Sequence, residues 1–345
     1  MDRRHFVVAA GACIVATRIA AAAPAPPVAT IVADLASKTR ALYHDGSLAA
    51  AIADRLEADF RSGAFQAAGS PMTLATLLNE RIARASRDLH FMVMPGEMHA
   101  PPVPSTPPHS SIPPFTPDEL NYLQERDFGI REAVVLPGNV GRLGVRQFYR
   151  PAKEVRDRLG QAMAALSRTA ALIVDLAGNP GGDPHAVALL LSYFFEREPF
   201  VVNRFLWRDR PVEEFRTTAA PGGPRYGESR PLVVTVTKSS YSAAEEFAYD
   251  VQALRRGLVV GEATGGGANH ALPVPIAGGF TAFIPQARAE NPITRSNWEG
   301  KGILPDVKAG AADLAKLAHR EALRLVIGSG RKEAASIARA ALEAD

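Results

Sequence analysis

Residues 232–269 read LVVTVTKSSYSAAEEFAYDVQALRRGLVVGEATGGGAN, and the rest of the chain is organised around this stretch. It begins with an apolar, β-branched run, 232–236, which is typical of a strand buried on both faces. The chain then passes through small polar residues into a helical pattern that starts at Ser242. The first N–H groups of a helix have no acceptor inside the helix, so a serine there lies beside donors that can stabilise negative charge.

Two interpretations of Ser242 follow from this position. As a helix cap, its hydroxyl accepts a hydrogen bond from the first turn, and Glu245 completes a capping box three residues later. As a nucleophile, it attacks a carbonyl group next to the same free N–H groups. Capping serines are far more common than catalytic ones, so position alone does not decide between the two.

Strands and helices alternate along the chain from about residue 128 onward. Gly138-Asn139 and Gly278-Gly279 each separate two apolar runs and predict hairpins. The alternation predicts an α/β fold with a parallel-sheet core and hairpins at its edges. The expected strands are 133–137, 140–145, 171–176, 200–207, 232–236, 258–261, 272–276 and 280–284, and the expected helices are 153–167, 184–195, 242–256 and 311–327.

The N-terminal third has a different pattern. Three apolar helical faces in 28–87, broken by turn residues, predict a small three-helix unit whose last helix is capped by Ser70 or Thr73. A short strand is expected at 89–94, and 118–126 can form one or two helical turns. The proline-rich segment 95–117 indicates an exposed connector with polyproline character. We therefore divide the chain into an export signal, a helical domain, a connector, an α/β domain and a C-terminal helical tail, at 1–25, 26–94, 95–127, 128–328 and 329–345.

The first 25 residues have the layout of an export signal. Arg3 and Arg4 precede a short apolar segment and a zone of small residues, 20–25, where cleavage is expected. Adjacent arginines resemble a twin-arginine signal, which exports folded proteins. The apolar segment is too short to span a membrane, so we expect a periplasmic protein without stable membrane insertion. Attachment of a lipid at Cys13 is the less favoured alternative.

Composition and motifs argue against several classes of function. The formal net charge is only +3 in 345 residues, and no basic patch is interleaved with aromatic residues, so nucleic acid is not an expected partner. Cys13 is the only cysteine, so a chain without its signal has no disulfide, cysteine nucleophile or cysteine-bound metal. The glycines at 265–267 lack the Lys-Ser/Thr that completes a phosphate-binding loop. We expect no cofactor and no metal, and the oligomeric state stays open.

Three loops follow expected buried strands, at 178–183, 239–242 and 262–270. In an open α/β sheet, ligands bind beyond the carboxyl ends of the strands. Gly181 and Gly182 would let backbone N–H groups approach a substrate, or they would simply form a tight turn that needs positive φ.

These motifs resemble those of the tail-specific (C-terminal processing) serine peptidases, family S41. The strand 172–176 with Asn179-x-Gly181-Gly182 resembles the family's strand and glycine turn, and 242–248 with 260–267 resembles its nucleophile helix and the following strand. Residues 297–306, NWEGKGILPD, resemble its closing motif. The resemblance implies a crotonase-like (ClpP-like) fold with no PDZ domain. It is greatest to the branch that includes the interphotoreceptor retinoid-binding protein modules and tricorn-like peptidases.

The resemblance also implies a catalytic triad. The better-known branch uses a lysine where this chain has Gly267, which rules out a Ser–Lys dyad through that position. Matching the tricorn-like branch instead makes Ser242 the nucleophile, His90 the general base and Glu299 the carboxylate that orients it. This set is chemically complete, because a serine hydroxyl needs a positioned base near neutral pH and a carboxylate stabilises the imidazolium.

Alternatives remain for the base and for the orienting carboxylate. His270 in the glycine-rich loop and His185 after the Gly-Gly turn are rival bases, and Glu299 could instead pair with a lysine or arginine.

The resemblance also implies oxyanion donors, namely the backbone N–H groups of Gly181 and Ala243, with Gly182 beside the substrate. The chain departs from the family's pattern at Pro180, which lacks an N–H where relatives have glycine. It departs again at Ala177 and Leu89, where relatives carry arginine and serine.

Two functions are therefore expected from the sequence. The first is an exported serine peptidase that acts on peptides or proteins. The second is a non-catalytic binder of a hydrophobic small molecule, such as a retinoid, built on a peptidase fold.

Overall fold

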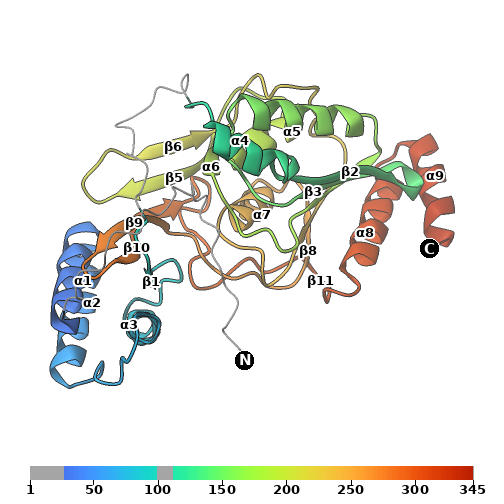
Figure 1. Cartoon of the computed structure of the whole chain (residues 1–345). Helices are drawn as coiled ribbons and strands as arrows, with labels where there is room; N and C mark the ends of the chain where they lie inside the picture. The colour runs from blue at the N-terminus through green and yellow to red at the C-terminus, as the bar shows by residue number, and fades with distance from the viewer. Residues whose placement is uncertain (1–26, 99–111, 345) are drawn as a thin grey trace.

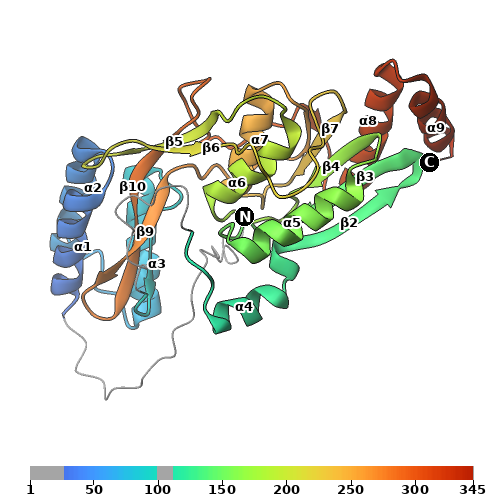
Figure 2. The same cartoon turned by 90° about the horizontal axis from the view of Figure 1, so that it is seen from above.

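The computed structural model describes residues 27–98 and 112–344. It has a helical lobe at one end, an α/β core in the middle and a helical pair at the other end (Figures 1 and 2). The export signal and most of the proline-rich connector lie outside the described residues. Within the described residues, no helix is both long and apolar enough to cross a bilayer.

The α/β core is built on a six-stranded sheet in the order β11-β8-β7-β4-β3-β2. Neighbouring strands run parallel except for the β2–β3 hairpin at one edge, which turns at Gly138-Asn139 as predicted. The strands are β2 (Ile130–Leu136), β3 (Val140–Val145), β4 (Ala171–Asp175), β7 (Leu232–Val236), β8 (Leu258–Gly261) and β11 (Val307–Lys308).

Helices cover both faces of this sheet, which explains why its central strands are continuous apolar runs. In β4, Leu172 and Val174 pack into one hydrophobic cluster with the helices α5, α6 and α7, whereas Ala171 and Ile173 pack against α8 and α9 on the opposite face. The helices are α5 (Lys153–Leu166), α6 (Pro184–Leu191), α7 (Ala243–Ala253), α8 (Leu314–Gly328) and α9 (Lys332–Glu343).

The second sheet is antiparallel and links the core to the helical lobe. Its order is β1-β10-β5-β6, with β9 also paired to β10. The long strand β10 pairs with β1 and β9 near its start and with β5 near its end. The strands are β1 (Met92–Pro95), β5 (Val201–Trp207), β6 (Glu213–Arg216), β9 (His270–Ile276) and β10 (Phe280–Glu290).

The helical lobe contains α1 (Val28–Leu42), α2 (Gly46–Arg61) and α3 (Pro71–Ser86), as the three apolar faces predicted. Ser70 caps α3, because its hydroxyl accepts a hydrogen bond from Thr73 N–H at 3.1 Å. A fourth helix, α4 (Pro117–Gln124), begins in a capping box and leads into the core.

The predicted α/β class and its parallel core are confirmed, but several details differ. The strand expected at 280–284 extends to Glu290. The strand expected from residue 89 begins only at Met92, because Asp88 Oδ1 accepts the N–H of His90 at 3.0 Å and holds the chain in a bend. The helix expected to reach 195 ends at Leu191 and continues as a short 3₁₀ turn. The strands β6 and β11 were not predicted, because both are short and lack an apolar pattern.

Candidate active site

Three loops meet where the parallel strands β4, β7 and β8 end, as the sequence predicts. Ser242 lies between β7 and α7 with φ 54° and ψ −120°. This is a sparsely populated conformation for a residue with a side chain, and such strained residues cluster at functional sites. The capping partner Glu245 is also present, since its carboxylate accepts the N–H of Ser242 at 2.9 Å.

The glycine turn after β4 packs directly against Ser242. Gly181 has φ +105°, and a Cβ atom there would lie 2.7 Å from Ser242 Cβ and 2.9 Å from the Ala243 nitrogen. At Gly182, φ is +138° and a Cβ would collide with the Phe148 carbonyl oxygen at 1.8 Å. Both glycines are therefore required by the turn itself, because each has positive φ and each lies too close to its neighbours to carry a side chain. Their approach to a substrate stays a prediction.

The N–H of Gly181, which the family resemblance implies as an oxyanion donor, is already engaged. It donates to Asn179 Oδ1 at 2.8 Å. The Asn179 side chain is itself fixed, because its Nδ2 donates to the Val145 carbonyl at 3.0 Å. Ala243, the first residue of α7, keeps the position expected of an oxyanion donor at a helix N-terminus.

Glu245 holds the glycine-rich loop against the start of α7. Its carboxylate is fully buried and accepts hydrogen bonds from the N–H groups of Gly266 at 2.6 Å and Gly267 at 2.9 Å, in addition to that of Ser242. Burial raises the pKa of this carboxyl to about 7, against the lowering effect of its hydrogen bonds. Sequence reasoning assigned Glu245 only the capping role, because its second set of partners lies about twenty residues away.

Tyr241 occupies the space beside Gly267. A Cβ at residue 267 would lie 2.2 Å from the Tyr241 ring carbon Cζ and 2.3 Å from its hydroxyl oxygen. The position that carries lysine in the Ser–Lys branch is therefore filled by a tyrosine ring in this chain. Because a side chain cannot be added there without moving that ring, the absence of lysine is a structural requirement of this packing.

His90 packs on the same tyrosine, with the ring centroids of His90 and Tyr241 4.8 Å apart. The structure thus places His90 beside the residue that precedes Ser242. Among the described residues, no hydrogen bond joins the His90 ring to the Ser242 hydroxyl. Catalytic hydrogen bonds are often long without substrate and shorten when it binds, so this separation does not remove His90 as a base.

Glu299 and Asp88 both lie against the His90 ring. One nitrogen of His90 and one oxygen of each carboxylate all lie within 4.8 Å of one another. Glu299 is held by backbone groups, because it accepts the N–H of Leu89 at 3.2 Å, Ala268 at 2.6 Å and Asn269 at 2.9 Å. No salt bridge from Glu299 to a lysine or arginine is found within residues 27–98 and 112–344.

Burial shifts the pKa values of His90 and Glu299 in opposite directions. It lowers the pKa of His90 to about 4, which keeps the imidazole neutral near pH 7, as a general base requires. Burial, together with the negative charge of Asp88, raises the pKa of Glu299 to about 7. The cluster therefore combines a neutral imidazole with two carboxylates that repel each other.

Asp88 is the residue of this cluster that sequence reasoning missed. It is buried, with 3% of its surface exposed, and its Oδ2 accepts from Asn269 Nδ2 at 2.9 Å and from the Tyr43 hydroxyl at 3.2 Å. The available signal was its position two residues before His90. Its partners are 45 and 181 positions away, and no local pattern predicts such contacts.

The two rival histidines have other surroundings. The His270 ring stacks on Phe205 with centroids 4.6 Å apart and meets Trp207 edge-on. Burial, together with the neighbouring His90, lowers the pKa of His270 to about 4. The His185 ring packs against Phe215 with centroids 4.8 Å apart, and the backbone N–H of His185 donates to Asp183 Oδ1, which caps α6. The rings of both rivals thus pack on phenylalanine, whereas that of His90 packs on Tyr241.

Residues 139–309, which contain the whole six-stranded sheet except β2, match peptidase family S41. The chain belongs to that family. This match starts after His90 and the helical lobe, so it bears on Ser242 and Glu299 but leaves their roles as predictions.

Solved structures share the fold at low sequence identity. A lipoprotein from Streptococcus agalactiae aligns with a TM-score of 0.52 at 13% identity, over 84% of this chain and 95% of its own. The tricorn protease aligns with a TM-score of 0.52 at 12% identity, over 88% of this chain and 37% of its own. A photosystem II D1 C-terminal processing protease aligns at 22% identity and a TM-score of 0.41, over 53% of this chain. The alignment spans only 46% of the length of that protease.

Proposed function

We propose that this S41 protein is an exported serine-type peptidase that hydrolyses peptide bonds with Ser242, His90 and Glu299. The observation that carries the proposal is the strained backbone of Ser242 at the start of α7, in contact with Gly181 and one residue from the tyrosine that packs on His90. A strained serine at a strand-to-helix turn is costly for the fold, and catalysis gives a reason for its presence. The signal-like N-terminus supports export.

In this mechanism Ser242 Oγ attacks the carbonyl carbon of the scissile peptide bond while His90 takes the hydroxyl proton. His90 then gives that proton to the leaving amine, which leaves an acyl group on Ser242. Water repeats the sequence and releases the acid. Glu299 holds the imidazole and stabilises its charged form. The Ala243 N–H stabilises the oxyanion, and the turn at Gly181 and Gly182 lies beside the bound substrate.

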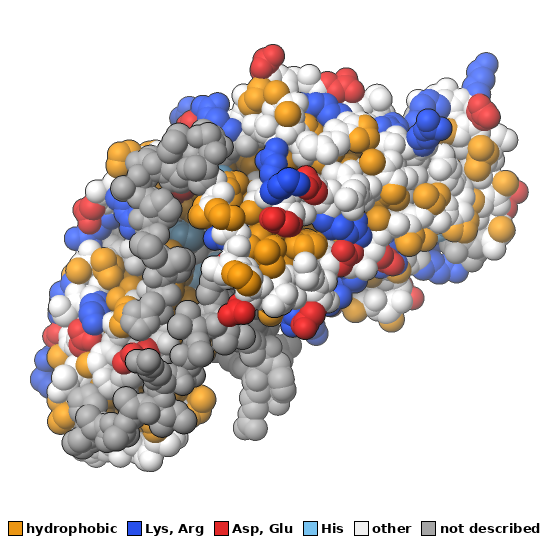
Figure 3. Space-filling model, turned by 45° about the horizontal axis from the view of Figure 1, so that its top comes forward, with side chains coloured by type: hydrophobic (Ala, Val, Ile, Leu, Met, Phe, Trp, Pro, Cys, Tyr) orange, Lys and Arg blue, Asp and Glu red, His pale blue; other side chains and the backbone are white. Residues whose placement is uncertain are grey.

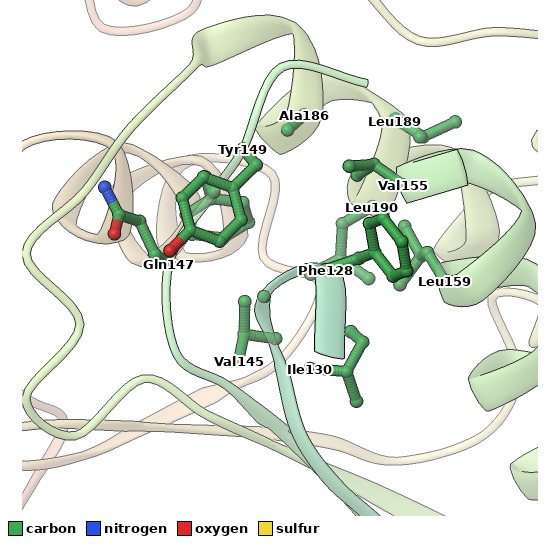
Figure 4. Close-up of a pocket in the computed structure, with 12 residues that line it drawn as sticks. Phe128, Ile130, Val145, Gln147, Tyr149, Val155, Leu159, Ala186, Leu189 and Leu190 are labelled. Atoms are coloured by element: carbon green, nitrogen blue, oxygen red, sulfur yellow. The ribbon is translucent and has the colours of Figure 1, made fainter. Parts of the chain in front are cut away.

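The predicted alternative, a binder of a retinoid-like molecule, needs an apolar cavity large enough to hold such a molecule. One apolar cavity lies between the start of β2, the residues after β3 and the helices α5 and α6 (Figure 4). Its volume is about 20 Å³, which is roughly the room that one water molecule needs. A second cavity of about 160 Å³ is lined by Arg131, Arg142 and Asp175 and is therefore unsuited to an apolar ligand. Hydrolysis is the better-supported function.

The test is covalent labelling with a fluorophosphonate probe, together with cleavage of a fluorogenic peptide library. We expect the wild type to be labelled and Ser242→Ala to lose labelling and cleavage. Ser239→Ala is the matched control, because Ser239 is an exposed serine in the same loop and should leave both unchanged. Labelling that survives in Ser242→Ala would exclude Ser242 as the nucleophile. Absence of labelling and cleavage in the wild type would overturn the peptidase proposal.

A further inference from the structure

We propose that Asp88, His90 and Glu299 bind one divalent transition-metal ion, of which Zn²⁺ is the representative, and that the bound ion reversibly blocks Ser242. Metal binding is independent of the proposed peptidase function, and only the blocking of Ser242 rests on it. No metal was expected from the sequence, in which these three residues lie in two segments about 210 positions apart.

The three side chains lie close enough together to share one ion. The three ligand atoms lie within 4.8 Å of one another. Ligands at about 2.0–2.2 Å from a tetrahedral zinc ion are roughly 3.3–3.6 Å apart, so a small inward movement of the side chains completes the site. Asp88 and His90 come from the same bend after α3, whereas Glu299 comes from the closing motif before β11.

The His90 ring can supply one of the ligands. The Nδ1 atom of His90 is buried and has no hydrogen-bond partner among the described residues. Buried polar atoms in folded proteins nearly always have a partner, so an unpartnered one needs an explanation. A lone pair on a neutral imidazole next to two carboxylates is a ready ligand for a cation, and the cation would also offset the repulsion between the carboxylates.

Hydrogen bonds from neighbouring groups hold both carboxylates in place. Three backbone N–H groups fix Glu299, while Tyr43 Oη and Asn269 Nδ2 fix Asp88. Outer hydrogen bonds of this kind orient ligands in metal sites and leave further lone pairs on the carboxylates free to bind. Asn269 contacts both acids, since its N–H binds Glu299 and its side chain binds Asp88.

The donor set selects the class of metal. One imidazole nitrogen with two carboxylate oxygens suits Zn²⁺, Co²⁺ or Ni²⁺, whereas Ca²⁺ and Mg²⁺ prefer sites made only of oxygen. Three protein ligands leave a coordination position open. A metal-bound imidazole cannot take a proton from Ser242, so occupancy removes the general base of the proposed mechanism.

The test is calorimetric titration of Zn²⁺ into the untagged, chelator-treated full chain, with the visible absorption of bound Co²⁺ as a second readout. We expect one equivalent to bind. His90→Gln, Asp88→Asn and Glu299→Gln should each weaken binding at least tenfold. The matched control is His319→Gln, a buried histidine on α8 that should bind zinc like the wild type. Circular dichroism checks that each variant is folded.

A flat wild-type titration, or binding that persists in all three folded variants, would overturn the metal site. Zinc should also stop fluorophosphonate labelling of the wild type, and a chelator should restore it at least tenfold. Binding of zinc by a chain that the probe never labels would retain the site and reject the peptidase. Labelling that zinc binding leaves unchanged would reject the blocking effect.

Discussion

Tyr241 and Gly267 form the contact that separates this active-site region from the Ser–Lys pattern. The tyrosine is buried, with 5% of its surface exposed, and its ring lies against both Gly267 and His90. Gly267 needs no positive φ, so the reason for glycine is the ring alone. A lysine there would have to displace the ring on which His90 packs.

We therefore predict that Gly267→Ala destabilises the protein by about 1–3 kcal/mol, the usual cost of overpacking a filled site. Gly267→Lys should destabilise it at least as much and should not create an active Ser–Lys dyad. Urea unfolding measures the first effect and probe labelling the second. Gly310→Ala is the control, because nothing lies within 4 Å of an added Cβ there.

A mutant cycle tests the cause of this effect. If the Tyr241 ring is responsible, Gly267→Ala should cost clearly less in a Tyr241→Ala background than in the wild type. Equal costs in the two backgrounds would show that the glycine is required for another reason.

At the scale of the element, the helix α7 carries a second feature besides the nucleophile. Glu246 and Asp250 are four residues apart on one face and are 3% and 1% exposed. Asp250 accepts a hydrogen bond from Asn291 Nδ2 at 2.8 Å, but Glu246 Oε1 and Asp250 Oδ2 have no partner among the described residues. Burial raises the pKa of both carboxyls well above the ordinary range, and the charge of Asp250 adds to the effect on Glu246.

The raised pKa values predict a loss of stability as pH rises. The folded state holds protons that the unfolded chain has released, so this contribution is fully present below the ordinary carboxyl pKa and disappears as pH rises through the folded values. Glu246→Gln removes one of the two acids. Between pH 5 and pH 8, we expect the free energy of unfolding measured in urea to fall less for this variant than for the wild type. The difference should be about 1.4 kcal/mol for each unit of raised pKa that lies in that window.

Glu125→Gln is the control for this series, because the Glu125 side chain is 77% exposed and its substitution should leave the pH profile of the wild type unchanged. Parallel profiles for Glu246→Gln and the wild type would show that the buried pair does not govern the pH dependence.

At the scale of the whole molecule, the helical lobe and the β9–β10 hairpin share one hydrophobic core. Ile31, Leu35 and Leu56 pack in the same cluster as Ile276 and Ile284. Backbone and side-chain hydrogen bonds cross this boundary, from Lys38 Nζ to the Pro275 carbonyl at 2.7 Å and from the Ala277 N–H to Asp34 at 2.8 Å. The lobe also brings His90 and Asp88 to the site, so it contributes to both stability and chemistry.

The face in Figure 3 carries scattered charges of both signs, with no single-sign patch suited to nucleic acid.

We predict that residues 112–345 alone do not form a stable soluble protein, because removal of the lobe exposes the inner face of β9 and β10. Size-exclusion chromatography and thermal unfolding should show aggregation or loss of a cooperative transition. A variant that starts at residue 27 should stay soluble and unfold cooperatively. Cooperative unfolding of 112–345 at the wild-type temperature would show that the shared core is not needed.

Much of the fold was predictable because its signals are local. Runs rich in apolar and β-branched residues mark the buried strands β4 and β7, and Gly138-Asn139 marks a hairpin, whatever the rest of the chain does. The strand expected at 89–94 was the main error. There the alternation of apolar residues was outweighed by a side-chain bond from Asp88 to the backbone, which no periodicity reveals.

The sequence by itself determined the α/β class, the order of the motifs, the S41 resemblance and the position of Ser242 at a strand-to-helix turn, because these depend on patterns within short stretches. Only the tertiary structure decided what surrounds that serine. It placed Tyr241 against Gly267, engaged the Gly181 N–H with Asn179, and joined Asp88 to His90 and Glu299. Contacts between residues up to about 210 positions apart depend on how whole elements pack, and a stretch of sequence read alone does not contain that information.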